Sequence, residues 1–378
     1  MMMQTGSFIT IRDLSYSRAL LLRMQLELRG VDCFISGIQS GEPIVDLWVE
    51  QHHAALALKL FDELRLASGF QKEQWVKYLR RIRRILVPVD FSERSIKAAH
   101  YALELARTLK AELHLLHVWF QSGVEGLIFN EMYAFQADLG SLLREQEQVA
   151  MNQLNELSYS LKNRILTERI RGVSVSTDLV RGSTIDTLLA IVEEFEPGLV
   201  VMGTRGKNRD SMSLIGSTTS RMMARCNVPV LAVPEGYDIS QFIAPKAVAY
   251  ITHYQKSDFQ ALHRLISFVK PFKPKIFCLH VEMESERVVD RLLMQQFRDE
   301  MLTSRATATI ECGLIKAENP VDAIEAFVGE KNVDVIAIVM RKRSLLNQLF
   351  DPSLTRRLLY QTHLPLLVFP ENQNEFRF

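Results

Sequence analysis

The sequence has little cysteine and almost no net charge, and both shortages narrow the classes of protein to which it can belong. The four cysteines, Cys33, Cys226, Cys278 and Cys312, are far apart in the chain, and no two of them form a C-x-x-C pair. Neither a disulfide framework nor a cysteine-ligated zinc site is therefore indicated, which fits a reducing cytoplasm. The net charge of +1 provides no overall field that would attract nucleic acid or a membrane surface.

Long apolar runs and several catalytic motifs are missing as well. No stretch reaches the roughly 18 uninterrupted apolar residues of a transmembrane helix, and the first residues do not resemble a signal peptide. There is no G-K-[ST] P-loop, no G-x-S-x-G elbow and no H-E-x-x-H sequence. His52 and His53 are adjacent, but we find no cysteine or carboxylate at ligand spacing, so metal binding is not expected. The short basic run RRIRR at 80–84 favours a linker over a nucleic-acid contact.

An internal repeat organises most of the chain. The segment VPVLAVPE at 228–235 is repeated as LPLLVFPE at 364–371, an offset of 136 residues. The segment LHV at 116–118 is repeated at 279–281, where the offset is 163. The first repeat is therefore 27 residues longer than the second, and the additional residues must lie between about 119 and 172.

Strand and helix patterns alternate within each repeat, which predicts a parallel sheet covered by helices on both faces. The fold class is therefore α/β, with two doubly wound parallel-sheet units and a small N-terminal α+β domain. We expect a β-α-β-β-α accessory domain over residues 1–80, a first repeat over 81–236 and a second, degenerate repeat over 245–372. In the accessory domain, Gly30 is expected to cap the C-terminus of the first helix.

Glycine and hydroxyl residues are concentrated after the apolar strand LVVMG of the first repeat. Gly203 and Gly206 follow that strand, and Gly216, Ser217 and Thr218 stand where the next helix begins. Glycine permits the close backbone approach that a phosphate chain needs, and a helix N-terminus offers N–H groups and partial positive charge. Ligands of doubly wound sheets bind at the carboxyl ends of the strands. The pattern predicts a phosphate site, although Gly203 and Gly206 can also serve loop geometry, and Ser217 can simply cap the helix.

The segments RILVPVDFSERSIKAAHYALELA, LVVMGTRG and LIGSTTSRMMARCNVPVLAVP resemble the universal stress protein family in order and spacing. The resemblance is strong over about 81–235 and weaker over 245–371. It implies that both repeats have the adenine nucleotide alpha hydrolase-like fold. The first 80 residues resemble, much less specifically, a short bacterial signal-transducing domain.

The resemblance also implies roles for individual residues of the first repeat. In nucleotide-binding members of that family, G-x-x-G followed after nine residues by G-[ST] contacts the triphosphate, and this signature is complete here. Asp90 would accept hydrogen bonds from the ribose or adenine, or cap the helix that follows it. Pro88 and Val118 would line the adenine, and Met202 would touch the ligand beside Gly203. These last three residues are also typical of an ordinary core.

The second repeat lacks the signature. Val339 stands where Gly203 is expected, Lys342 where Gly206 is expected, and Pro352 in the place of Gly216. Side chains at the first two positions would crowd a phosphate, and proline removes an N–H donor. His253 replaces the aspartate that ends the first strand. The second repeat is therefore expected to be a structural or regulatory partner without a nucleotide.

Together these observations predict a cytoplasmic stress-response protein that binds ATP, or AMP or ADP, in the first repeat. Signalling would occur by ligand-linked conformational change, with no catalytic residue and no nucleic-acid or membrane partner. Two alternatives remain open. One is a scaffold that acts through protein contacts without nucleotide, and the other is a slow ATP hydrolase in which Mg²⁺ lies between the phosphates and Ser217.

Two further features concern the arrangement of the chain. Residues 121–140 are expected to form a mobile apolar segment near the nucleotide, or an ordinary loop packed on its own domain. The strands around 228–233 and 364–369 are too apolar to remain open sheet edges. We therefore expect them to pair antiparallel, so that the two repeats form an intramolecular pseudo-dimer.

Overall fold

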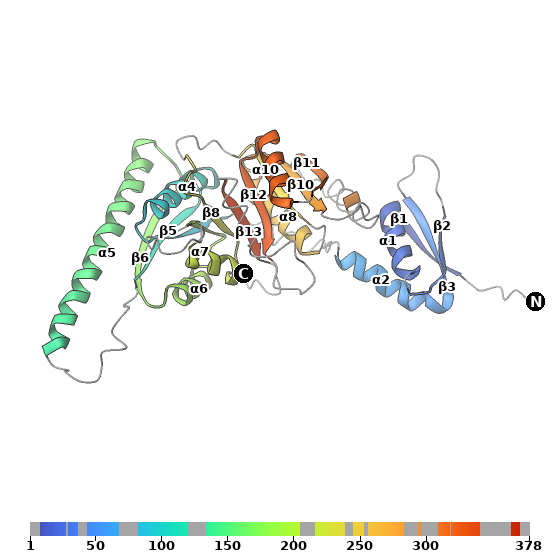
Figure 1. Ribbon diagram of the computed structural model, residues 1–378, viewed down its shortest axis with the longest axis horizontal. Coiled ribbons are helices and arrows are strands. Elements are labelled where there is room, and N and C mark those ends of the chain that lie inside the picture. The colour runs from blue at the N-terminus through green and yellow to red at the C-terminus, as the bar shows by residue number, and fades with distance from the viewer. Residues whose placement is uncertain are drawn as a thin grey trace, which may run out of the picture. The chain divides into compact units, whose positions relative to one another are not determined.

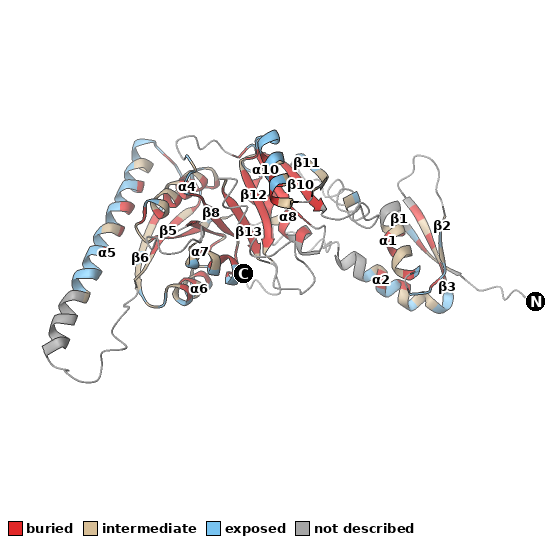
Figure 2. Cartoon of the chain, viewed as in Figure 1, coloured by how far each residue is buried: buried red, intermediate tan, exposed pale blue. Residues whose placement is uncertain are grey.

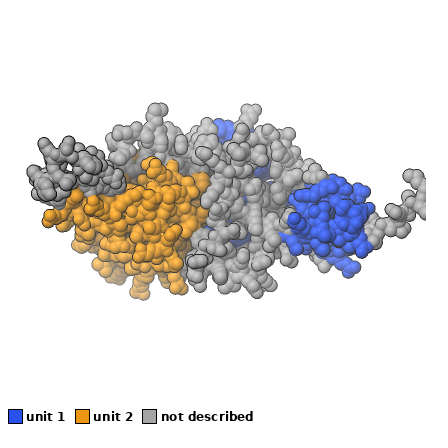
Figure 3. All heavy atoms as spheres, turned by 90° about the horizontal axis from the view of Figure 1, so that it is seen from below, with its two compact units in different colours: residues 1–80, 250–323 blue, residues 81–249, 324–378 orange. Residues whose placement is uncertain are grey.

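The computed structural model of the chain contains two compact units, residues 1–80 with 250–323 and residues 81–249 with 324–378 (Figure 3). The residues that the structure describes are 8–27, 29–36, 44–67, 82–119, 134–204, 216–238, 245–252, 256–282, 294–295, 309–317, 319–340 and 364–370.

The N-terminal residues form the β-α-β-β-α order that the sequence predicts. Their three strands make an antiparallel sheet in the order β1-β3-β2, and a core of leucine, valine, isoleucine and alanine side chains lies between this sheet and the helices. The elements are β1 (Phe8–Ser15), α1 (Tyr16–Glu27), β2 (Cys33–Ser36), β3 (Ile44–Glu50), the 3-10 helix η1 (Gln51–His53) and α2 (Ala54–Ala67).

The end of α1 shows why glycine stands at position 30. Gly30 has φ of +74°, a conformation that side chains disfavour. Its N–H donates to the Glu27 oxygen at 2.9 Å, and the Val31 N–H donates to the Leu26 oxygen at 3.0 Å. These bonds satisfy carbonyl groups at the end of the helix, so the predicted C-cap is confirmed.

The first repeat alternates strands and helices from β4 to β8 (Figure 1). In that view α6 and α7 lie together on one side of the strands, and α4 and α5 lie on the other. The elements are β4 (Arg84–Pro88), α4 (Glu93–Leu109), β5 (Glu112–Trp119), α5 (Ala134–Thr167), β6 (Val175–Arg181), α6 (Thr184–Phe195), β7 (Leu199–Gly203), α7 (Ser217–Arg225) and β8 (Val230–Val233).

The second repeat has the same alternation over its described residues. Its elements are β9 (Ala247–Ile251), α8 (Lys256–Val269), β10 (Lys275–Glu282), β11 (Thr309–Lys316), α10 (Pro320–Lys331), β12 (Val335–Met340) and β13 (Leu366–Pro370).

The strands of both repeats belong to a ten-stranded sheet in the order β11-β10-β9-β12-β13-β8-β7-β4-β5-β6. Within the first repeat, neighbouring strands run parallel. Strands β4, β7, β8, β12 and β13 are buried along almost their whole length (Figure 2), as expected for strands covered on both faces. The predicted α/β class, with parallel-sheet repeats and a separate small fold of an antiparallel sheet and helices, is therefore confirmed.

The last strands of the two repeats meet. β8 and β13 pair antiparallel, with Leu231 opposite Leu367 and Val230 opposite Val368. Leu231 and Leu367 are at most 1% exposed. The pairing thus removes from solvent the two apolar edges that the sequence could not leave open.

The 34-residue helix α5 lies in the segment of the first repeat that contains the additional residues. It buries Ala150, Leu154, Leu157 and Leu161, which recur at helical spacing on one face, while the rest of its described surface is largely exposed (Figure 2). Residues 134–140, which we expected in a mobile segment, are the first turns of α5. Residues 121–133 lie outside the described residues. No described helix is both long enough and apolar enough to cross a membrane.

Candidate functional site

The strand order of the first repeat defines where a ligand would bind. β4 pairs in parallel with β5 on one side and with β7 on the other. The strands after β4 are therefore added first on one side of it, as β5 and β6, and then on the other, as β7 and β8. In doubly wound sheets, such a switch point opens a crevice beyond the carboxyl ends of the strands. Asp90 follows β4, Val118 lies near the end of β5, and Gly203 ends β7. The structure thus brings these three predicted residues to one edge of the sheet.

Asp90 holds the turn between β4 and α4. Its Oδ1 accepts hydrogen bonds from the Ser92 N–H at 3.1 Å and the Ser92 hydroxyl at 2.6 Å. Ser92 is the N-cap of α4, and its Oγ accepts from the Ser95 N–H at 3.2 Å. The cap of α4 is therefore Ser92 and not Asp90, whose carboxylate holds the Ser92 side chain instead. A contact with nucleotide stays a prediction for this half-buried carboxylate.

Two aromatic rings next to Asp90 were missed by the sequence analysis. Phe91 has φ of +59°, which is unfavourable for a bulky residue, and its ring packs on the His117 ring with centroids 4.4 Å apart. His117 Nδ1 lies 2.7 Å from the Val89 oxygen. Because a carbonyl can only accept, Nδ1 carries the proton, and β5 is tied to the end of β4 beside the candidate site.

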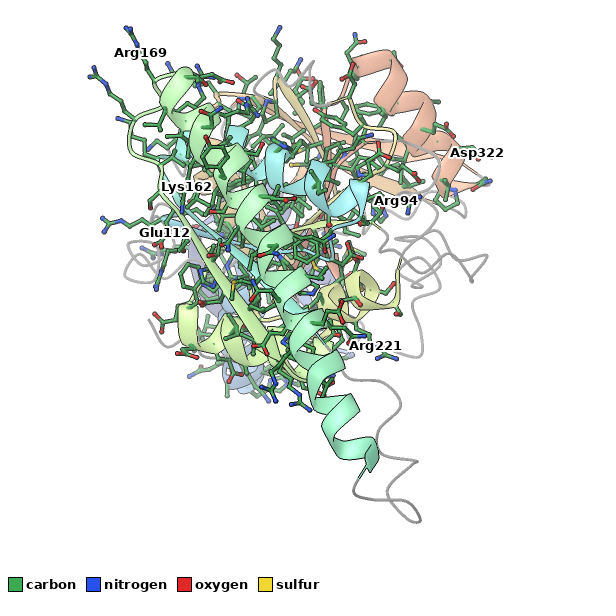
Figure 4. The ribbon with its side chains drawn as sticks, turned by 90° about the vertical axis from the view of Figure 1, so that its left-hand side faces the viewer. Arg94, Glu112, Lys162, Arg169, Arg221 and Asp322 are labelled. Atoms are coloured by element: carbon green, nitrogen blue, oxygen red, sulfur yellow. The ribbon has the colours of Figure 1, made fainter. Side chains whose placement is uncertain are left out.

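Gly203 is surrounded closely by protein. A Cβ atom at this position would lie 2.9 Å from the Arg94 carbonyl oxygen and 3.0 Å from the Arg94 carbonyl carbon. The Gly203 oxygen accepts from the Thr219 hydroxyl at 2.8 Å. The close approach that we expected at this glycine therefore exists, but in the structure it is to the start of α4, where Figure 4 labels Arg94. Contact with a phosphate stays a prediction.

The start of α7 provides hydrogen-bond donors. Gly216 is the N-cap; its N–H donates to the Thr204 oxygen at 2.7 Å, and its oxygen accepts from the Ser220 N–H at 3.0 Å. The N–H groups of residues 217–219 have no acceptor within the helix, because the first turn has no preceding turn. Ser217 is exposed and Thr218 is half-buried. This end of α7 can therefore present N–H and hydroxyl groups to an anion. Gly206 lies outside the described residues.

The residues expected to line an adenine differ in burial. Pro88 lies opposite Leu116 and is buried, and Met202 is 5% exposed. Val118 is half-buried at the end of β5. Val118 is therefore the most accessible of the three, while Pro88 and Met202 contribute to the core, as the alternative interpretation allowed.

An ion pair joins α4 to the chain just after β8. Arg94 Nη2 lies 2.6 Å from Glu235 Oε1, and this hydrogen bond is the main reason that the pKa of Arg94 is raised. Lys97 Nζ donates to the Glu235 main-chain oxygen at 3.2 Å. The positive charge of Arg94, next to Gly203, is therefore already engaged by a carboxylate.

Comparison with known proteins agrees with this architecture. The model of the universal stress protein family matches residues 81–234 and 248–370. The chain belongs to the universal stress protein family. One relative from Methanocaldococcus jannaschii is 26% identical over 151 residues, which cover 40% of this chain and 81% of the relative. A second from the same organism is 28% identical over 158 residues, covering 40% of this chain and 94% of that protein.

A solved universal stress protein from Archaeoglobus fulgidus shows the same fold over both repeats. Its TM-score is 0.59 at 17% identity, and the match covers 79% of this chain and 99% of the solved chain. At that identity the likeness concerns the fold.

The second universal stress protein repeat keeps part of the first repeat's geometry. Val339, at the position of Gly203, is fully buried in β12. His280 Nδ1 lies 2.9 Å from the Thr252 oxygen, a contact that corresponds to the one of 2.7 Å between His117 Nδ1 and the Val89 oxygen. Asp258 stands in the place of Ser95 and accepts from the Thr252 hydroxyl at 3.1 Å. His253, Lys342 and Pro352 lie outside the described residues.

A group of metal-binding side chains occurs away from this edge, in the N-terminal domain. The ligand atoms of Glu50, His52 and His53 all lie within 4.8 Å of one another, and His52 Nε2 is 3.2 Å from Glu50 Oε2. Our reason for excluding a metal, the lack of a nearby carboxylate, is therefore wrong, because Glu50 ends β3 directly before η1. All three residues are at least partly exposed, and such exposed groups commonly bind no ion.

Proposed function

We propose that the first repeat binds one adenine nucleotide, ATP or alternatively ADP or AMP, and that occupancy is signalled by a change of conformation. The observation that carries this proposal is the meeting of two features at one sheet edge. The switch point between β4 and β7 forms the usual ligand position of a doubly wound sheet, and the start of α7 follows the Gly203 strand there with exposed Ser217. Membership of the universal stress protein family supports the same function.

The donors for the phosphates would come from α7. The Gly216 N–H is already bonded to Thr204, and the Gly203 oxygen to Thr219. The phosphates would therefore meet the N–H groups of residues 217–219 and the hydroxyls of Ser217 and Thr218, and Gly206 is expected to contribute as the sequence predicts. The positive end of the helix favours this charge.

The adenosine would lie toward β4 and β5. Asp90, at the end of β4, would accept a hydrogen bond from the ribose or adenine while its Oδ1 keeps the turn closed through Ser92. Val118 would contact the base from β5, with Pro88 and Met202 supporting it from the core. Magnesium, where it accompanies the phosphates, would use the Ser217 hydroxyl.

Signalling would use the contact between the repeats. We propose that the β8–β13 pairing makes the two repeats an intramolecular pseudo-dimer, in which the second repeat is a nucleotide-free partner. The buried Val339 side chain in place of Gly203 supports this division. The cytoplasmic location expected from the sequence, the stress-response role and the division into domains at 80 and about 240 are parts of the same proposal.

A scaffold without nucleotide is the second candidate, because α5 exposes large apolar side chains. Tyr159 is 74% exposed, and Leu166, seven residues later on the same helix face, is 75% exposed. Such side chains could contact another protein.

Analysis of the purified protein separates the two candidates. The full chain is denatured, the released small molecules are identified by mass spectrometry, and the nucleotide-free protein is titrated with ATP, ADP and AMP by calorimetry. We expect one adenine nucleotide per chain. Absence of both co-purified nucleotide and measurable heat at millimolar ligand would reject nucleotide binding and favour the scaffold.

A further inference from the structure

Two cysteines that are distant in the sequence are neighbours in the second repeat. Cys278 on β10 and Cys312 on β11 are register partners in parallel strands. Register partners project their side chains from the same face of a sheet. Neighbouring strands are about 4.8 Å apart, which lies within the range of about 4.4–6.8 Å that joins the Cα atoms of a disulfide. The Cα spacing therefore falls within the range that a disulfide can join.

The two thiols interact but have different surroundings. Cys278 is completely buried, whereas Cys312 is half-buried on β11, the last strand in the sheet order. Burial, and then the hydrogen bond to the Cys312 side chain, raises the pKa of Cys278 well above its ordinary value. Cys312 is thus the thiol that an oxidant reaches first, and Cys278 is held beside it.

The other cysteines have separate positions. Cys33 lies on β2 of the N-terminal sheet, where its thiol is 3.8 Å from the Arg23 oxygen. Cys226 follows α7, and burial raises its pKa to about 11. Both can therefore serve as internal controls for the pair.

We propose that Cys278 and Cys312 form a reversible thiol–disulfide site that hydroperoxides oxidise. The Cys312 sulfur attacks one peroxide oxygen, the O–O bond breaks, and water or an alcohol leaves with the proton, so that Cys312 becomes a sulfenic acid. The Cys278 sulfur then attacks the Cys312 sulfur, the S–O bond breaks, and the hydroxyl leaves as water with the Cys278 proton. In total, two thiols are oxidised to one disulfide, and one hydroperoxide is reduced.

The geometry favours a bond that is easily reduced again. Disulfide Cβ atoms are about 3.8 Å apart, closer than the Cβ atoms of ordinary strand neighbours, so β10 and β11 must move together slightly. Strained disulfides are the labile and regulatory ones. Gly313 follows Cys312, so no side chain stands between β11 and the Leu279 side chain of β10 at this point.

Oxidation would reach the turn that corresponds to Asp90. The Cys278 thiol is close enough to Asp258 for that carboxylate to raise its pKa, and Asp258 accepts from the Thr252 hydroxyl at the end of β9. His280, two residues after Cys278, is bonded to the Thr252 oxygen. The Thr252 N–H also donates to the Leu279 oxygen of β10 at 2.8 Å, so a shift of β10 acts on all three of these contacts at the end of β9.

The test uses the full chain and hydrogen peroxide. After treatment, the protein is denatured with an alkylating reagent, digested without reductant and analysed by mass spectrometry. We expect a linked peptide pair containing Cys278 and Cys312, which dithiothreitol separates. Cys33→Ser and Cys226→Ser should retain the link, and Cys278→Ala and Cys312→Ser should lose it. Full alkylation of both thiols after peroxide, or a link from either to Cys33 or Cys226, would overturn the proposal.

A second measurement tests the order of the two steps without depending on the disulfide. Dimedone labels sulfenic acids, so Cys278→Ala should increase labelling of Cys312 at least fivefold, because no neighbouring thiol removes the intermediate. Cys226→Ala is the matched control and should leave the labelling of Cys312 unchanged. Equal labelling of Cys312 with and without Cys278 would show that the two cysteines only pack against each other. Circular dichroism of each variant checks that the fold is retained.

Discussion

The two repeats hold the end of their first strand in different ways, and the difference separates what the fold needs from what a ligand would need. In the first repeat the turn after β4 is closed by Asp90, Ser92 and Ser95. In the second, the buried Asp258 accepts from Thr252. A carboxylate closes both turns, but Asp90 lies in the turn itself, next to the candidate nucleotide site, whereas Asp258 lies in the following helix, α8.

A histidine contact is common to both repeats. In each repeat, a histidine Nδ1 lies close to the carbonyl oxygen of the residue that follows the first strand. The distance is 2.7 Å for His117, after β4, and 2.9 Å for His280, after β9. Since the second repeat has this contact while Val339 replaces Gly203, the histidine serves the fold, and the glycine and hydroxyl residues of the first repeat are the better candidates for ligand binding.

The largest expected effect concerns the strand pair that joins the repeats. Leu231→Asp places a carboxylate opposite Leu367 in a position that is 1% exposed. An unpaired buried charge should lower the free energy of unfolding by roughly 3–5 kcal/mol and cause aggregation. The control Leu166→Asp on α5, 75% exposed, should change it by less than about 0.5 kcal/mol. Urea denaturation measures both, and equal effects would contradict a buried contact between β8 and β13.

A pH comparison sets His263 against His100, which occupies the matching position of the first repeat. Burial lowers the pKa of His263 to about 3. Burial, then Arg164, lowers that of His100. Because both folded-state values lie below the unfolded value of about 6.5, the unfolded chain binds more protons, and stability is lost as the pH falls from about 6.5 towards 3.

His263→Gln should therefore remove acid sensitivity on the order of a few kcal/mol between pH 7 and 4, and His100→Gln should remove less. Urea midpoints at successive pH values measure this, after the neutral-pH change is subtracted. If both variants kept the slope of the unmodified protein, neither histidine would be buried in its neutral form.

The third prediction tests why glycine stands at the end of β7. Gly203→Ala brings Cβ to 2.9 Å from a main-chain oxygen of α4, so we expect a loss of about 1–3 kcal/mol of stability from overpacking. Gly329→Ala is the matched control in α10, where nothing lies within 4 Å, and it should stabilise by roughly 0.5–1 kcal/mol. The two variants should therefore differ in sign in urea denaturation. A neutral Gly203→Ala would show that α4 yields at this contact.

The smallest expected change in free energy is a loss of nucleotide binding. Gly216→Val retains an allowed backbone, since Gly216 has φ of −60° and ψ of 148°, but adds a branched side chain at the start of α7. Nucleotide affinity should fall at least tenfold, about 1.4 kcal/mol, with little change in the fold. Val339→Gly should create no site in the second repeat. Calorimetry that found two equivalent sites in the unmodified chain would contradict a single site.

Sequence periodicity predicts the described elements well, because local apolar spacing and end signals such as Gly30 indicate where strands and helices begin and end. It cannot predict contacts between distant segments. The approach of Gly203 to Arg94, and the pairing of Cys278 with Cys312, depend on how β7, α4, β10 and β11 are ordered in space. The cysteines were judged separate for this reason.

Two other differences have local causes. Glu50 was overlooked as a neighbour of His52 and His53. We expected a regular helix from residue 52, but the 3-10 helix η1 follows β3 and places the two histidines beside the Glu50 carboxylate. The first turns of α5 were assigned to a loop because residues 134–140 have no clear apolar stripe, whereas the helix is anchored farther along by Leu154, Leu157 and Leu161.

The antiparallel pairing of β8 with β13 has a consequence for where ligands can bind. β7 runs parallel to β8, and β12 runs parallel to β13, so the carboxyl ends of β7 and β12 point to opposite ends of the shared sheet. Because β8 and β13 belong to one polypeptide, dilution cannot separate them, so each of these two strands keeps the other covered at any protein concentration.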